Sequence, residues 1–412
     1  MINRLAVVTL LLTVNAAMAQ YNNQTSSPYS LFGLGSLNEA NAGKTNALGK
    51  SGIALPADTG INNLNPAAYA DIPKNSFLFD VGAKGTRNTY TNNADQSKNT
   101  TYNFSNISVA LSFSEKSGIG ITMSPYSDVG YSLQGVTGTV EGSQQTFTSY
   151  IQGSGGLNNV AVNYGYKITP KLNLGINASY YFGKISENEQ VALGAAYLAI
   201  TQENYYKGLR PALGLQYKVN PGFTVASVIT APANLTASQD RTVVKIVDDT
   251  QVVLDATTGG EADAFKLPLE AAIGIKYRLK SFTFNADYKR SFWDATGIED
   301  NIGTFADQDF VGLGVQYTPN VLRPSYVERI QYRLGYNMDN GYLEVNDNRI
   351  KNFAVTSGLG LPLSYRGSSS INISYSYGQR GAVSNTLVQE KYHLFTVNIS
   401  LEDIWFVKRK YE

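Results

Sequence analysis

The feature that most constrains the fold of this sequence is an alternation of apolar with small or polar residues, which runs from residue 76 almost to the C-terminus. Phe282 and Phe284, for example, share one face of their segment, whereas Thr283 and Asn285 share the other. Because successive side chains of a β-strand point to opposite faces, a period of two predicts strands. Fourteen segments fit this period: 76–90, 102–114, 118–133, 157–168, 171–184, 204–219, 222–236, 265–279, 281–292, 308–318, 326–338, 352–364, 370–379 and 390–403.

Every second connection between these segments is a short turn, and most of the others are longer and polar. The longer connections are 91–101, 134–156, 185–203, 237–264, 293–307, 339–351 and 380–389. An even number of strands with short turns at one end and long loops at the other is typical of an outer-membrane barrel. Since a sheet persists in lipid only when it is closed, we predict an all-β fold, a transmembrane antiparallel β-barrel of about 14 strands over 76–404. The chain is expected to enter and leave at the periplasmic end.

A soluble β-sandwich or a solenoid is the competing fold. Either would need polar outer faces, whereas each predicted strand has a continuous apolar face. No repeat of about 20–50 residues indicates a propeller or a solenoid. Beyond the N-terminus, no run of about 18 apolar residues predicts a spanning helix, and the mean hydropathy is −0.19.

Residues 1–19 have the pattern of a signal peptide. Arg4 provides a positive start, an apolar core follows, and Ala17 and Ala19 form a small-residue cleavage site before Gln20. A buried first helix is the disfavoured alternative. We therefore expect export to the outer membrane of a Gram-negative bacterium, and the absence of Cys excludes a lipoprotein. At the other end, 405–412 forms a basic tail.

Residues 20–75 show no sustained period and contain short apolar clusters separated by Gly, Asn and Pro. Such a segment suits short helices and turns that pack inside the barrel as a hatch or plug. Within it, Asn65 is predicted to cap a helix that begins at Pro66, since both residue types favour these positions.

The strand predicted at 118–133 contains a proline in its middle. Pro125 has no N–H to donate and its ring fixes φ, so it interrupts the hydrogen-bonded ladder. In a closed membrane wall, this break predicts a side opening.

Seven charged residues and one glutamine fall on the inward-facing positions of the predicted strands. The charged residues are Lys266, Glu270, Lys276, Arg278, Asp287, Lys289 and Arg333, and the glutamine is Gln331. Such groups bind the carboxylate of a ligand, or pair with one another and with the plug. The mixed signs favour pairing.

Nothing in the sequence points to an enzyme, a cofactor or a metal. The single histidine, His393, falls on the lipid-facing side of the last strand, which disfavours a serine hydrolase. Acidic pairs such as Asp248–Asp249, Glu299–Asp300, and Asp307 with Asp309 match no calcium-loop spacing, so solvated loop charge is the favoured interpretation. A net charge of +1 gives no electrostatic case for nucleic acid.

The sequence also resembles the FadL/TodX family of outer-membrane transporters of hydrophobic compounds. The resemblance runs over most of the mature chain, and its specific parts are the hatch motif Asn65, Pro66 and Ala67 and the strand that contains Pro125. Further matches are the glycine-punctuated stretches 48–54, 332–336, 358–362 and 374–378, together with Asp58.

The resemblance implies a fourteen-stranded barrel with an N-terminal hatch. It also implies that Asn65, Pro66 and Ala67 form the hatch tip, and that Ser124, Pro125 and Tyr126 form a kink that opens the wall. An apolar solute leaves sideways through such a gap, because it gains nothing from an aqueous exit.

The first hypothesis for function is therefore an outer-membrane channel that takes up hydrophobic small molecules, such as long-chain fatty acids, by lateral exit. The alternative is a FadL-like barrel that does not transport and acts as a subunit or adaptor of an outer-membrane protein secretion or assembly complex. A plain diffusion pore is disfavoured, because 21–75 is large enough to block the lumen. Expected partners are membrane lipid and lipopolysaccharide, a hydrophobic ligand, and other outer-membrane proteins.

Overall fold

The computed structural model describes residues 25–404 except 94, 113, 140–141, 143, 194–195, 248–249, 299–302, 320–324, 364–368 and 384–386. The expected signal peptide, 1–19, and the expected basic tail, 405–412, lie outside the described residues.

Short 3-10 helices and long strands make up the described chain. The helices are η1 (Pro28–Leu31), η2 (Gly43–Ala47), η3 (Pro66–Asp71), η4 (Asp294–Thr296) and η5 (Val327–Arg329). The strands are β1 (Ser36–Leu37), β2 (Ser76–Thr91), β3 (Gln96–Leu111), β4 (Ser117–Thr139), β5 (Thr146–Lys167), β6 (Leu172–Leu193), β7 (Ala196–Asn220), β8 (Phe223–Thr230), β9 (Ala233–Val247), β10 (Thr250–Leu267), β11 (Leu269–Leu279), β12 (Phe282–Phe292), β13 (Gly303–Phe305), β14 (Gln308–Tyr317), β15 (Gln331–Asp339), β16 (Leu343–Val345), β17 (Asn348–Arg349), β18 (Asn352–Pro362), β19 (Ser370–Arg380) and β20 (Gln389–Ile404).

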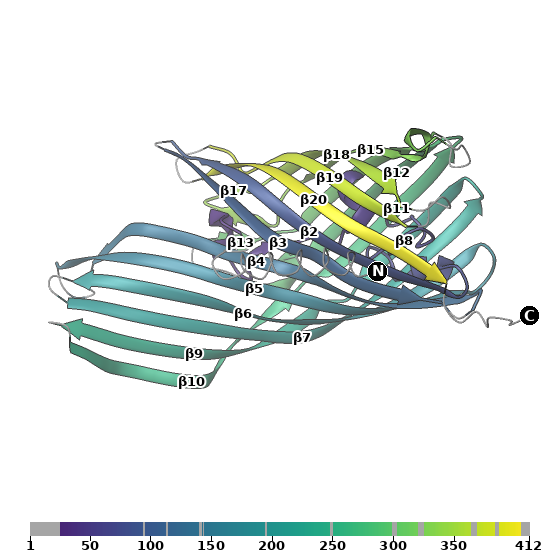
Figure 1. Ribbon diagram of the computed structural model, residues 1–412. Coiled ribbons are helices and arrows are strands. Elements are labelled where there is room, and N and C mark those ends of the chain that lie inside the picture. The colour runs from purple at the N-terminus through teal and green to yellow at the C-terminus, as the bar shows by residue number, and fades with distance from the viewer. Residues whose placement is uncertain are drawn as a thin grey trace, which may run out of the picture.

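Fourteen of the described strands form a closed antiparallel barrel, as the sequence predicted (Figure 1). Its wall runs in the order β2, β3, β4, β5, β6, β7, β8, β11, β12, β14, β15, β18, β19 and β20. The pairing of β20 with β2, from Ile404 opposite Ser76 to Gln389 opposite Thr91, closes the ring. Closure gives the backbone groups of both terminal strands a partner, which lipid would not supply.

The alternation in the sequence separates the two faces of this wall. Outward-facing residues such as Ile273, Leu313 and Leu334 are 46–58% exposed, whereas the lumen buries polar residues such as Asn285 and Asn337. No helix in the described part of the chain is both long and apolar enough to cross a membrane. An apolar outer face on a closed barrel identifies an outer-membrane β-barrel protein.

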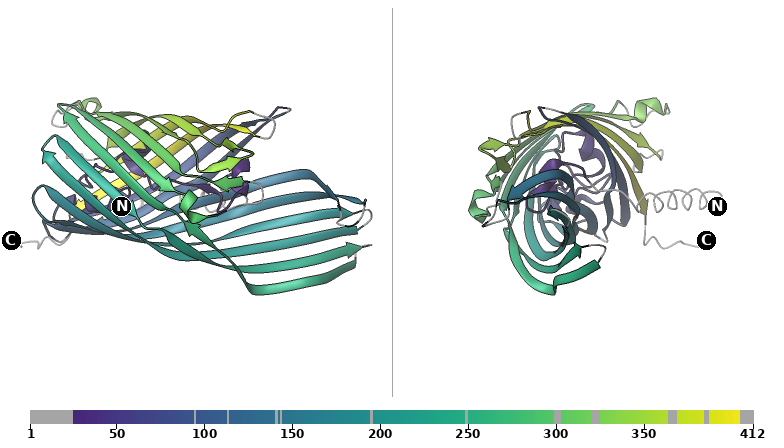
Figure 2. Two further views of the ribbon diagram at one scale, coloured as in Figure 1. Left: turned by 180° about the vertical axis from the view of Figure 1, so that it is seen from behind. Right: turned by 90° about the vertical axis from the view of Figure 1, so that its left-hand side faces the viewer.

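Residues 25–75, here called the lumenal segment, lie inside the ring of strands (Figure 2, right). Helix η3 packs against β4 to β7, and η2 packs against β15 and β18 to β20. The wall approaches the segment closely where it carries glycine: a Cβ on Gly175 would collide with the backbone of Pro66 and Ala67, and a Cβ on Gly214 with the Asn65 side chain and the Pro66 ring. Glycine at these positions therefore lets the segment pack directly on the wall.

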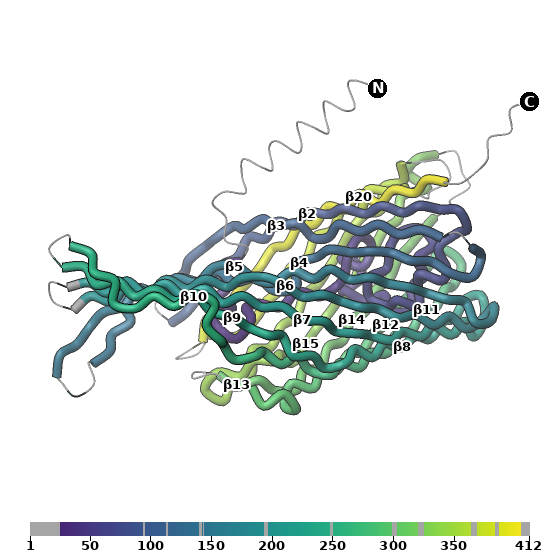
Figure 3. Tube along the Cα trace, turned by 90° about the horizontal axis from the view of Figure 1, so that it is seen from below, coloured from purple at the N-terminus to yellow at the C-terminus, as the bar shows by residue number. Residues whose placement is uncertain are grey.

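Strands β4 to β7 continue well beyond the barrel and, with β9 and β10, form a curved sheet, here called the arm (Figures 1 and 3). The arm consists of the outer parts of β4, β5, β6 and β7 together with β9 and β10, paired in that order. It projects from the end of the barrel opposite to the start of β2 and the end of β20 (Figure 1).

The expected loops at 134–156, 185–203 and 237–264 are therefore mostly strands, and that expectation was wrong. The reason is that both faces of much of the arm meet solvent, so its sequence lacks the apolar alternation that lipid imposes on the barrel.

Two prolines mark where the chain leaves the wall and returns to it. The predicted strand 222–236 is interrupted at Pro232 between β8 and β9, and the predicted strand 265–279 is interrupted at Pro268 between β10 and β11. Strand β7 pairs with β8 in the barrel and with β9 in the arm, so the sheet branches between these two partners.

Arg210 of β7 fixes this branch point. Its guanidinium donates hydrogen bonds to the carbonyl oxygens of Ala231 (2.9 Å) and Pro268, which are the two exits of the β9–β10 hairpin. It also lies 3.4 Å from a carboxylate oxygen of Glu270, and its side chain is only 2% exposed. One buried cation thus connects the arm to the barrel.

We predict that Arg210→Met loosens the arm. The substitution leaves two buried carbonyl oxygens and the Glu270 carboxylate without their partner, a loss of about 3–5 kcal/mol. The expected result is faster proteolysis within 233–267 and a lower Tm in detergent. Arg241→Met is the matched control, because Arg241 pairs with Asp255 in the arm but is 41% exposed. Equal protease resistance of the two variants would contradict the anchoring role of Arg210.

Candidate functional site

The barrel wall separates at one seam, between β3 and β4. These strands pair only from Ile107 opposite Met123 to Leu111 opposite Ile119. Beyond Met123, β4 remains paired with β5, and the rest of β3 remains paired with β2, so the two strands diverge (Figure 1). The separation begins next to Ser124, Pro125 and Tyr126, where the β4–β5 register also shifts.

The lumenal segment occupies the base of this seam. Strand β1 pairs with β4, with Ser36 opposite Asp128 and Leu37 opposite Ser127. The N–H of Asn38 donates to the carbonyl oxygen of Tyr126 at 2.8 Å. The chain's own N-terminal part therefore supplies hydrogen bonds that β3 no longer supplies to β4.

Four polar side chains, here called the seam latch, bridge the gap. Asp128 of β4 accepts hydrogen bonds from the side-chain amides of Asn38 (2.8 Å) and Asn103 of β3 (3.0 Å). Lys84 of β2 lies 3.4 Å from Asp128 and donates to Asn38 at 2.8 Å. The sequence analysis missed these residues; the only signal was an acidic residue three positions after Pro125 in an otherwise uncharged strand.

A cavity of about 240 Å³ lies behind Pro125. Tyr126, Tyr181 and Trp293 contribute aromatic lining, and the Tyr126 and Tyr181 rings meet edge to face at 4.6 Å. Its charged lining includes Arg210 with Glu270. This mixture suits a small molecule with one apolar and one polar part.

An apolar cluster packs beside the cavity, where the barrel meets the arm. Its buried members are Leu34, Leu157, Tyr181, Leu235, Leu267, Trp293 and Phe305. Because Leu34 belongs to the lumenal segment, this cluster also anchors that segment.

Most of the predicted inward-facing charges meet a partner. Asp287 accepts hydrogen bonds from the backbone N–H groups of Gly52 (2.6 Å) and Ile53 (2.9 Å). Lys289 lies 2.5 Å from Glu39. These contacts tie the wall to the lumenal segment.

Arg333 is 3% exposed and has neutral partners. It donates to the side-chain oxygens of Gln316 (2.9 Å), Asn372 (2.7 Å) and Gln331. It therefore holds β14, β15 and β19 together.

Three other predicted charges differ in position. Lys276 is partly buried, whereas Arg278 is exposed near the turn between β11 and β12. Lys266 is also exposed, so the expectation that it faces the lumen was wrong. Lys266 belongs to β10 of the arm, and the break at Pro268 separates its alternation from that of β11.

Electrostatics favour the ionised form of Glu39. Burial by itself raises the pKa of this carboxyl, but the ammonium groups of Lys289 and Lys50 outweigh burial and hold the pKa below its ordinary value. The pairing of Glu39 with Lys289 therefore stabilises the fold at pH values above the ordinary pKa of a glutamate. This stabilisation is lost as the pH falls through the lowered pKa.

The Asn65–Pro66–Ala67 motif has the predicted local geometry. Asn65 caps η3 by accepting a hydrogen bond from the N–H of Ala67 (2.9 Å), and Pro66 is the first residue of the helix. The Asn65 amide also donates to the carbonyl oxygens of Ile53 (3.0 Å) and Leu215 (3.2 Å). The motif packs on β6 and β7, whereas β1 is the part of the lumenal segment that pairs with β4 beside Pro125.

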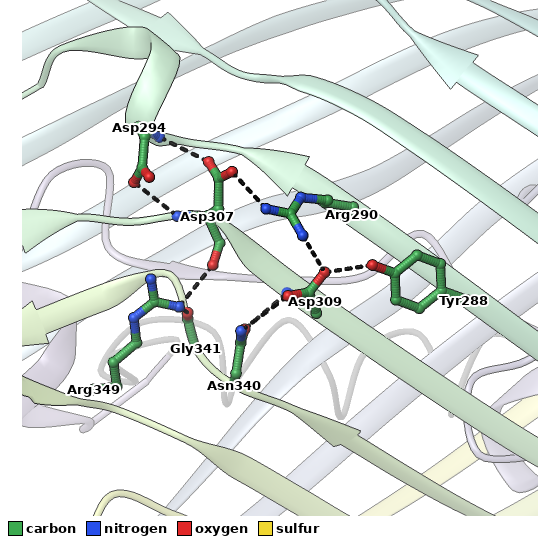
Figure 4. Close-up of polar contacts among 8 residues, drawn as sticks. All are labelled: Tyr288, Arg290, Asp294, Asp307, Asp309, Asn340, Gly341 and Arg349. Atoms are coloured by element: carbon green, nitrogen blue, oxygen red, sulfur yellow. Dashed lines mark hydrogen bonds and ion pairs between the residues drawn. The ribbon is translucent and has the colours of Figure 1, made fainter.

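Loops at the rim of the barrel are held by a polar cluster (Figure 4). Arg290 pairs with Asp307 (3.0 Å) and Asp309 (3.3 Å), and the backbone N–H groups of Asp294 and Asp307 donate to each other's carboxylates. Arg349 donates to the carbonyl oxygen of Asp307 at 2.7 Å. Asp307 and Asp309 thus bind an arginine.

The other acidic pairs, Asp248–Asp249 and Glu299–Asp300, lie outside the described residues. Within the described ranges, no group of three or more His, Asp or Glu side chains is placed to hold a metal ion.

His393 lies between outward-facing aromatic residues. Its Nδ1 is 2.8 Å from the hydroxyl of Tyr375, and its ring lies 5.2 Å from that of Tyr377. No serine or carboxylate contact to His393 is present among the described side-chain hydrogen bonds.

Comparisons with known proteins define the family and the fold. The BamG family model matches residues 1–412, the whole chain. The toluene transporter TbuX of Ralstonia pickettii superposes with a TM-score of 0.58 and 16% identity over 86% of this chain and 96% of TbuX. The toluene transporter TodX of Pseudomonas putida superposes with a TM-score of 0.59 and 16% identity, over 90% of this chain and 99% of TodX. A FadL homologue of Pseudomonas aeruginosa superposes with a TM-score of 0.62 and 10% identity, over 88% of this chain and 98% of the homologue.

At these identities the likeness establishes the fold, and the predicted FadL/TodX barrel is confirmed. A search of curated proteins found no match.

We predict that Asp128→Ala opens the base of the seam. Asp128 is 6% exposed and Lys84 is 19% exposed, so the substitution leaves a largely buried ammonium group unpaired, a loss of about 3–5 kcal/mol. A cysteine introduced at Leu37 should then react faster with a maleimide. The double variant Lys84→Met with Asp128→Leu removes both charges and should recover most of the lost stability. Unchanged labelling in Asp128→Ala would show that the latch does not hold β1.

Proposed function

Because this chain belongs to the BamG family, and because the lumenal segment packs on the barrel wall and the seam is bridged, we propose that it is a barrel subunit or adaptor of an outer-membrane protein assembly or secretion complex. The observation that carries this proposal is the arm. In the membrane, the outer wall of the barrel meets lipid and lipopolysaccharide.

The arm is larger than passage of a small molecule requires. Its part of β7, which pairs with β9 from Tyr197 to Lys207, alone extends about 35 Å. A sheet that projects beyond the barrel is suited to contact a neighbouring protein.

The contacts inside the barrel support free passage of a solute less well than they support a subunit role. The apolar cluster is packed, the lumenal segment is tied to the wall by Lys289–Glu39 and by Asp287, and the seam latch bridges the gap. A solute that crosses must break buried polar contacts, each of which is costly to leave unpaired. The same contacts hold the barrel rigid, which suits a scaffold.

We predict that the full chain, purified from its own membrane in mild detergent, carries a stoichiometric protein partner that survives a salt wash. The matched control trims the arm and leaves the barrel intact. In it, a two-residue turn replaces the tip of each hairpin beyond the opposing pairs Val129–Gly155, Ile185–Asn204 and Gln239–Gly260, which removes the outer part of β4 as well.

The partner should be lost from the trimmed chain, while the barrel still reaches the outer membrane. Mass spectrometry of the same samples identifies both proteins and bound lipids. A chain that purifies alone, with a fatty acid or another apolar molecule bound, would contradict the subunit role and support transport.

A second candidate function is passage of hydrophobic small molecules, such as long-chain fatty acids, with lateral exit. It is favoured by the juxtaposition of an unpaired seam, Pro125 and the cavity behind it. In this function the ligand's apolar part packs on Tyr126 and Tyr181, and the ligand leaves where β3 and β4 diverge.

For this candidate we predict that Pro125→Ala reduces uptake of a labelled fatty acid. Alanine restores a backbone N–H and lets β4 pair more regularly, which narrows the gap. Pro170→Ala, in the turn between β5 and β6, is the control and should not change uptake. Normal uptake by Pro125→Ala at normal surface level would rule out the lateral exit.

A further inference from the structure

Strand β4 is both the seam edge of the barrel and one edge of the arm. On its seam side, the lumenal segment covers β4 from Tyr126 to Gly130. The carbonyl oxygen of Tyr126 accepts from the N–H of Asn38 (2.8 Å), and the N–H of Gly130 donates to the hydroxyl of Ser30 (3.0 Å). The chain thus already adds a backbone segment to this edge.

Beyond Gly130 the edge has no strand partner in the described part of the chain. Backbone groups of alternate residues point to the same side of a strand, so Ser132 continues the direction set by Gly130. Its N–H and carbonyl oxygen face the seam. The register with β5 stays regular as far as Gln134, so this stretch of edge is straight.

The edge also lacks the usual protection against pairing. Residues 130–139 contain no charged residue and no proline, the two commonest devices that keep an edge strand solitary. The opposite edge of the arm, β10, differs: it has three register shifts and carries Asp255, Glu261 and Asp263. Register shifts and charges therefore protect β10 more strongly than β4, which beyond Gly130 has one shift, between Gln134 and Val136.

We propose that the seam side of β4 from Gly130 to Gln134 binds an extended strand of a partner envelope protein by β-augmentation, which continues the pairing that the lumenal segment begins. This inference rests on the proposed function as a subunit and names how the partner binds. Main-chain hydrogen bonds supply affinity in this mode, and alternate side chains supply specificity.

The faces of β4 define the chemistry of the added strand. Tyr131 is 6% exposed on the inner face, where its hydroxyl donates to Glu187 at 2.5 Å, and Leu133 is partly buried on the same face. Ser132 and Gln134 are exposed on the outer face. The partner strand therefore alternates apolar residues, which lie beside Tyr131 and Leu133, with polar residues that lie beside Ser132 and Gln134.

The test is site-specific photo-crosslinking in the full chain in its own membrane. Benzoylphenylalanine is placed singly at Ser132, Leu133 and Gln134, with Val253 on the protected β10 edge as the control. The crosslinked residues are identified by mass spectrometry. We expect all three probes to crosslink to one continuous segment of the partner. The crosslinked residue should shift along this segment as the probe is moved along β4. Val253 should not capture this segment.

A second pair of variants tests the backbone hydrogen bond directly. Ser132→Pro removes the seam-facing N–H, whereas Ser132→Ala keeps it. With the probe at Gln134, crosslinking should fall about tenfold in the proline variant, as expected for one lost backbone hydrogen bond, and should not change in the alanine variant. Equal yields in both variants would overturn the inference.

The remaining outcomes separate this inference from the proposed function. A partner that co-purifies but gives scattered crosslinks, or none, from β4 overturns β-augmentation and leaves the subunit role standing. Crosslinks to β3 of the same chain, to a second copy of this chain or to lipopolysaccharide alone also overturn it. Absence of any co-purifying protein overturns both.

Discussion

The constraint on which this structure depends is that each backbone N–H and carbonyl group in the wall needs a hydrogen-bond partner. Closure through β20 and β2 satisfies it around most of the barrel. Strand pairing does not meet this requirement at one seam, because Pro125 and the adjacent register shift separate β4 from β3. At this seam, β1 pairs with β4 and the seam latch bridges β4 to β2 and β3. The interior of the barrel is therefore organised around the break.

The same requirement explains how the arm is joined. Where β7 changes its partner from β8 to β9, Ala231 and Pro268 at the two ends of the inserted hairpin lie outside the paired strands. Arg210 supplies donors to both ends and pairs with Glu270. A buried cation with three partners is stable where a lone one would not be.

Much of the fold could be predicted from the sequence. In lipid the outer face must be apolar, so strands such as β12 show their alternation directly, and the Asn65 cap follows from local preferences. The arm could not be predicted in this way, because solvent on its faces imposes no such pattern. Pro232 and Pro268 are the available signal in the sequence, since each interrupts a segment whose alternation predicts one strand.

The sequence by itself determined the barrel, its number of strands and the position of the break at Pro125, because alternation and proline chemistry act locally. Only the tertiary structure decided what fills the break: Asn38, Lys84 and Asn103 meet Asp128 from three parts of the chain. Likewise, only the tertiary structure showed that the seam continues into the edge of β4 beyond Gly130, which has no strand partner among the described residues. Contacts between distant segments depend on strand register and on strand length, and neither leaves a local mark in the sequence.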